Sequence, residues 1–263
     1  MSRGGAFWAP LALVVFAWAS GAQAQTDEIQ VYDGDIAAPR VLNLTLHDNY
    51  VARGLRSPAF PGAFPADGSF NGVPEFAYGV TDWFEAGAYL PLYSVPKGGR
   101  PTLNGAKLRA LFVEPNSADR SYFFGLNFEF SLNARHWDPH RYTAEIRPIL
   151  GWRAGKVELI FNPILDTAYN GVSRMDFAPA TRLAYKVDSR WVIAVEHYAD
   201  LGPLHGFESP GQQAHQLFAV ADFKGPIDVE FGAGFGLTRA SDRLTFKLIL
   251  SRDIATLGTG DRH

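Results

Sequence analysis

The stretch from Ser121 to Asn133, SYFFGLNFEFSLN, alternates between large apolar residues and small or polar ones. The polar parity contains one large apolar exception, Phe123. A period of two predicts a β-strand with one apolar and one polar face. The strand is also long for a soluble sheet. Such a strand suits a wall that has lipid on one side and a polar lumen on the other. The apolar parity consists of Tyr122, Phe124, Leu126, Phe128, Phe130 and Leu132.

Similar alternation recurs along the chain, and no convincing helix follows the first 24 residues. The connections after even-numbered segments are short, and most of those after odd-numbered segments are longer, above all residues 52–72. Short turns at one end and long loops at the other are typical of outer-membrane barrels. We therefore expect an all-β fold, a single antiparallel up-and-down transmembrane β-barrel of about 12 strands. The faces of the segment 213–223 are ambiguous. The expected strands lie near 40–51, 73–81, 83–93, 104–114, 120–133, 140–154, 156–167, 174–187, 190–201, 213–223, 226–238 and 241–251.

The first residues have the pattern of a cleaved signal peptide. Arg3 precedes an apolar run, and Ala22-Gln23-Ala24 provides small residues for cleavage. The expected organisation is a signal peptide (1–24), a periplasmic lead-in (25–39), the β-barrel (40–251) and a C-terminal tail (252–263). No later apolar run is long enough to predict a transmembrane helix. The chain has no cysteine, which excludes disulfides and thiolate metal sites, and its net charge of −3 gives no reason to expect nucleic acid.

Three tryptophans lie beside short turns: Trp83, Trp152 and Trp191. Indole rings favour the boundary between membrane and water, because an apolar ring carries one polar N–H. We expect these side chains to be membrane-interface aromatics at the periplasmic end of the barrel. The alternative is that they are ordinary core tryptophans of a soluble sandwich.

Several segments resemble a known group of barrels. The sequence YGVTDWFEAGAYLPLY (Tyr78 to Tyr93) resembles a hairpin of outer-membrane barrels of the meta-pathway phenol-degradation type. The stretches 145–166, 196–203 and 234–250 are similar to uncharacterised exported barrels of that broad group. The resemblance spans most of the chain and implies a transporter in the outer membrane of a Gram-negative bacterium. It implies no catalytic residue. The chain ends in His263 instead of the usual aromatic residue, so the signal for the outer-membrane assembly machinery is expected within Phe246 to Leu250.

If the apolar parity faces lipid, the other parity faces the lumen. Opposite charges in a narrow lumen are expected to pair, so these residues form either a structural network or a selectivity region. Two groupings are the first choices for a site, one from Glu145 to Asp166 and one from Glu196 to Asp200. The candidate lumen-lining residues are Glu129, Glu145, Arg147, Glu158, Asn162, Asp166, Arg182, Glu196, Tyr198, Asp200 and Glu230.

The function expected from these patterns is that of a pore or transporter for passive uptake of small molecules, with hydrophobic or aromatic solutes suggested by the resemblance. One alternative is a structural or adhesive barrel with a plugged lumen. Another is an outer-membrane lipid hydrolase using His47. No nucleophile-elbow motif is present, and the loop His136–His140 lacks a fourth metal ligand. We expect no catalytic residue, metal or cofactor. The expected partners are outer-membrane lipid, the assembly machinery and an unidentified solute, but no nucleic acid.

Overall fold

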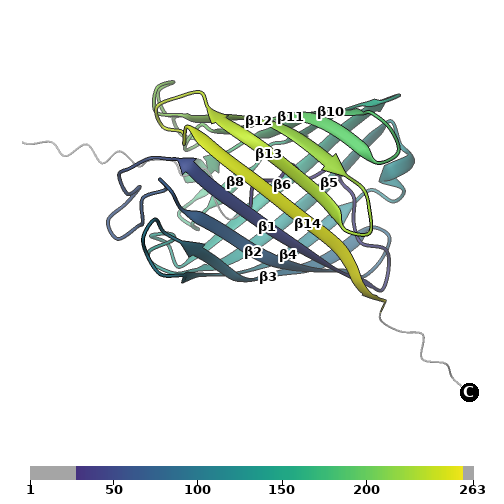
Figure 1. Cartoon of the computed structure of the whole chain (residues 1–263), viewed down its shortest axis with the longest axis horizontal. Coiled ribbons are helices and arrows are strands. Elements are labelled where there is room, and N and C mark those ends of the chain that lie inside the picture. Colours follow the sequence, from purple (N-terminus) through teal and green to yellow (C-terminus); the bar gives the residue numbers. More distant parts are fainter. Residues whose placement is uncertain (1–27, 257–263) are drawn as a thin grey trace, which may run out of the picture.

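The computed structural model describes residues 28–256, which form a closed antiparallel barrel of 12 strands (Figure 1). The strands pair in chain order except at two interrupted strands, where β7 pairs with β10 and β8 with β9, and β1 pairs with β14 to close the wall. The predicted fold class is confirmed. The expected signal peptide and residues 257–263 lie outside the described part of the chain.

The strands follow the predicted order with shifted ends. They are β1 (Val41–Arg53), β2 (Phe70–Gly79), β3 (Phe84–Val95), β4 (Thr102–Val113), β5 (Tyr122–Asn133), β6 (Tyr142–Ala154), β7 (Val157–Asn162), β8 (Leu165–Thr167), β9 (Asp176–Phe177), β10 (Ala180–Lys186), β11 (Trp191–Asp200), β12 (Ala214–Phe223), β13 (Asp228–Gly236) and β14 (Leu244–Thr256). Two short 3₁₀ turns, η1 (Ser117–Asp119) and η2 (Val172–Arg174), lie in connections. Within residues 28–256 no helix has the length and hydropathy needed to cross a membrane.

Two of the predicted strands are interrupted. Segment 156–167 is divided into β7 and β8, which both pair with β6, and segment 174–187 is divided into β9 and β10. Pro163 and Pro179 lie in the two interruptions. Proline has no N–H to donate to a neighbouring strand, so the ladder breaks there. The Ala178 N–H donates to the Ile164 carbonyl at 3.0 Å, which keeps the two broken strands side by side.

The last strand runs further than predicted. Val41 at the start of β1 pairs with Thr256, so residues 252–256 belong to β14 and not to the tail expected from residue 252. The reason is that β1 begins at residue 41 and its backbone groups take partners from the closing strand. The ambiguous segment 213–223 is also resolved. Phe218 points into the barrel, whereas Leu217 is exposed on the outer face.

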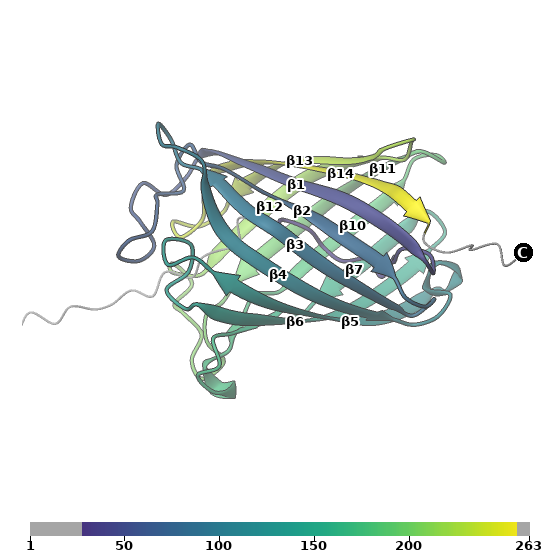
Figure 2. The ribbon, with the colours of Figure 1, turned by 90° about the horizontal axis from the view of Figure 1, so that it is seen from below.

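The two ends of the barrel differ as the loop lengths predicted (Figure 2). The long loops gather at one end, where the loop 54–69 projects away from the barrel. The Lys97 Nζ donates to Asp67 at 2.9 Å, and the Gly54 N–H also donates to that carboxylate, so the loop is tied to the rim. These hydrogen bonds, led by the one from Lys97, lower the pKa of Asp67. The connection after β4 is longer than the expected tight turn, because it contains η1.

Candidate functional site

The candidate lumen residues all lie on the inner face of the barrel. Paired residues share a face, and the pairs Glu129–Glu145 and Arg182–Glu196 lie directly opposite each other. Their polar side chains are therefore enclosed by the wall, away from the outer surface. Glu129, Glu145, Arg147, Asn162, Arg182, Glu196 and Asp200 are buried, and Glu158, Asp166, Tyr198 and Glu230 are half-buried.

One charge network occupies the part of the lumen formed by β2 to β6. The Arg147 Nε donates to Glu145 at 2.6 Å, and Lys107 Nζ lies 3.4 Å from Glu129 Oε2. Arg109 forms ion pairs with Glu75, at 2.7 Å, and with Glu85. Buried charges that are paired in this way avoid the large cost of an isolated buried charge.

A second network lies across β10 to β14. Arg182 pairs with Glu196 and also contacts Asp222 and Glu230. Lys247 Nζ lies 2.6 Å from Glu230 Oε1 and also pairs with Glu196. The Tyr198 hydroxyl donates to Glu196 at 2.7 Å.

The structure divides both predicted groupings. Glu158 pairs with Arg153 at one end of the wall, whereas Arg147 pairs with Glu145. Asp200 stands apart from Glu196 and accepts a hydrogen bond from the Gly202 N–H at 2.9 Å. Asp166 remains opposite Glu145, as the register requires.

Residues 28–39 lie inside the barrel, in contrast to the expected periplasmic lead-in (Figure 2). We call this stretch the lumen segment. Ile29, Val31 and Tyr32 are buried to 4–6% exposure. The segment leaves the barrel at the short-turn end, where Pro39 forms a bridge to Gly79. The sequence did not indicate this placement, because the partners that bury this stretch come from distant parts of the chain.

Wall side chains hold the backbone of the lumen segment at several points. The Tyr32 N–H donates to Asn162 Oδ1 at 2.8 Å, and Asn162 Nδ2 donates back to the Tyr32 carbonyl at 3.1 Å. Arg147 donates to the Gln30 carbonyl at 3.1 Å, and Lys247 donates to the Ile29 carbonyl at 3.2 Å. Asn162 and Arg147 were predicted to line the lumen, and Lys247 is the ion-pair partner of two other predicted residues. All three bind the backbone of this segment directly.

Further contacts hold the other half of the segment. The hydroxyl of Ser117, in η1, donates to the Gly34 carbonyl at 3.0 Å, and the Ala37 N–H donates to Glu85. The connection after β4 therefore contacts the lumen segment through η1.

The side chain of Tyr32 occupies a slot in the first charge network. Its ring centroid lies 4.2 Å from the Arg147 guanidinium carbon and 5.5 Å from that of Arg109. Its hydroxyl lies 2.6 Å from the Tyr89 hydroxyl and donates to Glu129 at 3.0 Å. Guanidinium groups are attracted to the face of an aromatic ring. The slot thus contacts both the ring and the hydroxyl of Tyr32.

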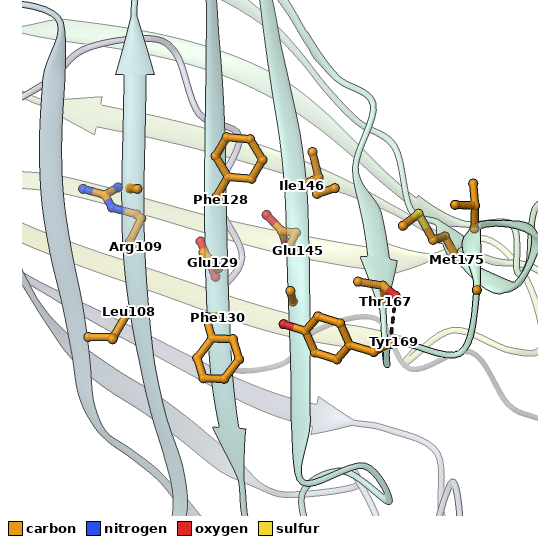
Figure 3. A pocket seen from close by; sticks show the side chains of 14 residues that line it. Leu108, Arg109, Phe128, Glu129, Phe130, Glu145, Ile146, Thr167, Tyr169 and Met175 are labelled. Atoms are coloured by element: carbon orange, nitrogen blue, oxygen red, sulfur yellow. Dashed lines mark hydrogen bonds between the residues drawn. The ribbon is translucent and has the colours of Figure 1, made fainter.

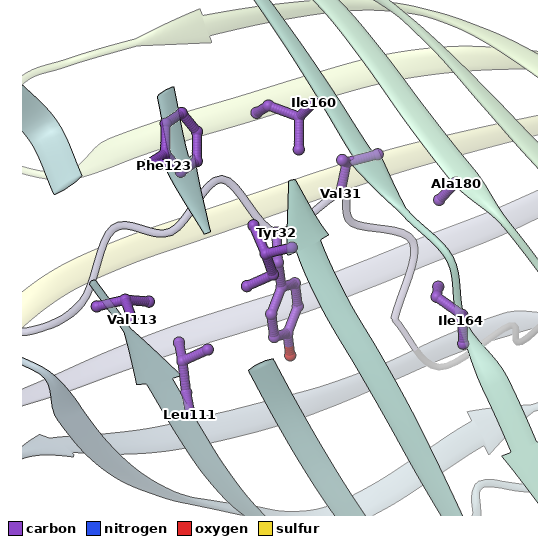
Figure 4. Packing of buried hydrophobic residues seen from close by; sticks show 9 residues of the cluster. Val31, Tyr32, Leu111, Val113, Phe123, Ile160, Ile164 and Ala180 are labelled. Carbon is purple, nitrogen blue, oxygen red and sulfur yellow. The ribbon is translucent and has the colours of Figure 1, made fainter. Parts of the chain in front are cut away.

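Apolar side chains on the polar parity complete the packing around the segment (Figure 4). Val31 and Tyr32 lie in one cluster with Phe123, the large apolar residue on the polar face of β5. The ring of Phe123 covers Gly151 so closely that a Cβ there would lie 1.9 Å from the ring. Phe123 therefore points inward because a glycine on the next strand leaves room for it and the lumen segment covers it.

Sequence reasoning missed Tyr32 and Tyr89, and it did not recognise the lumen segment. Two signals were present in the sequence. Phe123 and Phe218 both interrupt a polar inner face, and both lie directly opposite a glycine. Large inward rings of this kind indicate that something apolar fills the lumen beside them, and Ile29 packs in the cluster of Phe218.

Two cavities are lined in part by residues of the lumen segment. A cavity of about 530 Å³ opens toward the short-turn end, where Asp33, Glu85 and Asp228 are among its lining residues. A second cavity, beside Glu28 and Asp166, measures about 50 Å³.

His47, the residue considered for lipid hydrolysis, faces the lumen. It is 1% exposed, and its Nε2 lies 3.0 Å from Glu75 Oε2. Membrane lipid does not reach this position from the outer wall. Among residues 28–256, no three His, Cys, Asp or Glu side chains are grouped so that they could hold a metal ion.

The three tryptophans beside short turns are on the outer surface. Trp83, Trp152 and Trp191 are 37–45% exposed, and Trp191 lies 5.0 Å, centroid to centroid, from Phe223. They are not core residues of a soluble sandwich. Their role at a membrane interface remains a prediction.

No protein-family model and no curated protein matches the chain. Solved structures do match. An outer-membrane channel from Pseudomonas putida F1 superposes with a TM-score of 0.58, covering 86% of this chain and 100% of that chain at 12% identity. The KdgM porin superposes with a TM-score of 0.52, covering 81% and 99% at 8% identity. This chain has the fold of an outer-membrane β-barrel. The finer resemblance to barrels of the phenol-degradation type remains a prediction.

Proposed function

We propose that this protein is an outer-membrane pore for passive uptake of small aromatic molecules, closed at rest by the lumen segment. The observation that carries the proposal is the slot around Tyr32. The chain's own phenol ring fills a place where a solute ring would fit, near two guanidinium groups and beside Tyr89 and Glu129.

The pore part of the proposal is supported by the distribution of polarity. Large apolar side chains cover the outer face, with Leu108 and Phe124 exposed by 63% and 59%, while charged side chains fill the inner face. That arrangement suits lipid outside and solutes inside. The matched structures of the same fold are named a channel and a porin. We extend this to placement in the outer membrane of a Gram-negative bacterium, with Phe246 to Leu250 as the assembly signal.

The gating part is supported by how the lumen segment is bound. Residues 28–38 form no strand with the wall and are held by side-chain contacts, several of them to carbonyl oxygens. Removing the segment breaks these separate contacts and leaves the backbone hydrogen bonds between the strands of the barrel intact. A segment held in this way can move while the wall stays closed.

The aromatic part is supported by the chemistry of the slot. After the segment leaves, Arg147 and Arg109 remain beside the vacated space, and Tyr89 and Glu129 remain within reach of a hydroxyl there. A small ring with a hydroxyl group satisfies all four. The resemblance to barrels of the phenol-degradation type suggests the same class of solute.

A second function has one observation in its favour. Side chains of several strands hold the backbone of the lumen segment, among them Asn162, Arg147 and Lys247, as expected for a structural barrel with a permanently plugged lumen. The two functions differ in whether solutes cross the folded protein.

Liposome swelling tests the proposal. Arbutin carries a phenol ring and methyl glucoside does not, so the two glucosides compare an aromatic solute with a matched sugar. We expect faster swelling with arbutin in Tyr32→Ala, which vacates the slot, and the loss of this advantage when Tyr89→Phe is added. Equal rates would refute the aromatic slot. No swelling with either solute, even in Tyr32→Ala, would show a plugged structural barrel.

A further inference from the structure

The outer wall carries an apolar groove of about 650 Å³ (Figure 3). It lies over β4, β5 and β6 and is bounded by the connection 168–175 between β8 and β9. The groove is separate from the lumen, because the side chains that form it belong to the outward parity. Leu108, Phe130 and Tyr169 are among them, and all three are exposed.

The groove results from one small residue in a row of large ones. Phe130 pairs with Leu108 on one side and with Ala144 on the other. Ala144 leaves a hollow there, and the ring of Tyr169 closes its far side at 6.5 Å from the Phe130 ring. The Tyr169 N–H donates to the Thr167 hydroxyl at 3.0 Å, which directs the connection back over the wall.

The groove lies near the long-loop end of the wall. Phe130 stacks at 6.1 Å on Tyr142, the first residue of β6, and Val172 in η2 is 71% exposed. Exposed apolar residues next to aromatic rings are typical of the zone where a membrane's hydrocarbon meets its headgroups. If the barrel spans the outer membrane, as proposed above, the groove opens into the outer leaflet.

Two arginines are adjacent in sequence to residues at the groove. Arg141 precedes Tyr142, and its guanidinium carbon lies 5.9 Å from that ring. Arg174 lies between Val172 and Met175, which both line the groove. Both arginines are exposed, and neither forms an ion pair with another residue of the described range 28–256. Glu129 and Glu145 border the groove only through the wall, since their side chains point inward.

We propose that this groove binds one acyl chain of an anionic membrane lipid, whose phosphate is held by Arg141 and Arg174. The proposal rests on the membrane placement given above and not on transport. Charge complementarity selects this occupant, because two arginines without an ion pair among residues 28–256 are adjacent in sequence to residues at an apolar hollow of the outer wall.

Native mass spectrometry of the full chain in detergent tests the proposal with dioleoylphosphatidic acid and dioleoylphosphatidylcholine as probes. We expect one phosphatidic acid molecule to bind more tightly than phosphatidylcholine. An arginine near a membrane surface contributes about fivefold to binding of an anionic lipid, so Arg141→Ala and Arg174→Ala should each weaken phosphatidic acid by about that factor. Arg190→Ala, an exposed arginine at the other end, is the matched control.

Ala144→Phe fills the hollow and should weaken both lipids by at least about tenfold, because the acyl chain loses its place. Ala219→Phe makes the same change on an exposed outer position of β12 and should have no effect. Val172→Asp tests the groove without changing the wall. Unchanged binding in Ala144→Phe and Val172→Asp would overturn the proposal, as would equal loss in Ala219→Phe. A protein dimer that Ala144→Phe dissociates would identify a second copy as the occupant and also overturn it. Failed solute transport would leave this result unaffected.

Discussion

Replacing Tyr32 by alanine should open the barrel. The ring is 4% exposed and lies against two guanidinium groups, and its hydroxyl contacts Tyr89 and Glu129. Truncating a buried aromatic side chain costs about 3–5 kcal/mol in typical cores. In the open state the ring is solvated, so most of this cost falls on the closed state. Taking about 3 kcal/mol, the ratio of closed to open protein should fall by about 150-fold.

Tyr32→Phe provides a graded comparison. It keeps the ring near the guanidinium groups and removes only the hydroxyl contacts. A lost hydrogen bond of this kind costs about 1 kcal/mol, so the same ratio should fall by about fivefold. The assay is single-channel recording in planar bilayers, with the fraction of time spent open as the readout. The different gel mobility of boiled and unboiled samples confirms that each variant is folded.

Two results would refute this reasoning. Folded Tyr32→Ala protein with the open fraction of the wild type would show that the ring does not hold the closed state. An effect of Tyr32→Phe as large as that of Tyr32→Ala would assign the contribution to the hydroxyl, and the ring contacts with the guanidinium groups would then contribute nothing measurable.

Two other predictions concern the wall and the rim. Gly151→Ala places a Cβ 1.9 Å from the Phe123 ring and should lower the free energy of unfolding by about 1–3 kcal/mol in urea titrations. Gly211→Ala, which has open space around it, should change this free energy little. Equal effects of the two substitutions would refute the close packing. Because the hydrogen bond from Lys97 lowers the pKa of Asp67, the rim contact is present above the ordinary aspartate pKa and is lost as the pH falls. Pepsin should therefore cut the loop 54–69 faster below about pH 4 in the wild type, relative to an Asp67→Asn variant that lacks this pH dependence; parallel profiles would contradict the prediction.

The wall was predictable because its signal is local. Alternation in β5 is enough to place Phe128 and Phe130 outside and Glu129 inside, since neighbouring residues of a strand point to opposite faces. The interruptions were harder to place. Pro163 and Pro179 were visible in the sequence, but whether a proline breaks a ladder depends on the partner strand beside it.

The contents of the lumen were not predictable in the same way. Asn162 binds Tyr32 across 130 residues of sequence, and no local pattern indicates such a contact. The charge of Glu158 and its place in the alternation predicted that it faces the lumen. Its ion pair is with Arg153 and not with Arg147, and this depends on its position along the barrel axis. Phe123 was recognised as an exception, but its explanation required both the glycine opposite and the lumen segment above it.

The central claim, that residues 28–38 close the lumen, is tested most directly by the reactivity of a single cysteine. The chain has no native cysteine, and Val31 is buried at 4% exposure, so Val31→Cys introduces one probe at a conservative position. We predict that a membrane-impermeant methanethiosulfonate modifies Val31→Cys at least about 100-fold more slowly than Arg100→Cys on an exposed loop, and that adding Tyr32→Ala removes most of this protection. Equal modification rates at positions 31 and 100 in the folded protein would contradict the account.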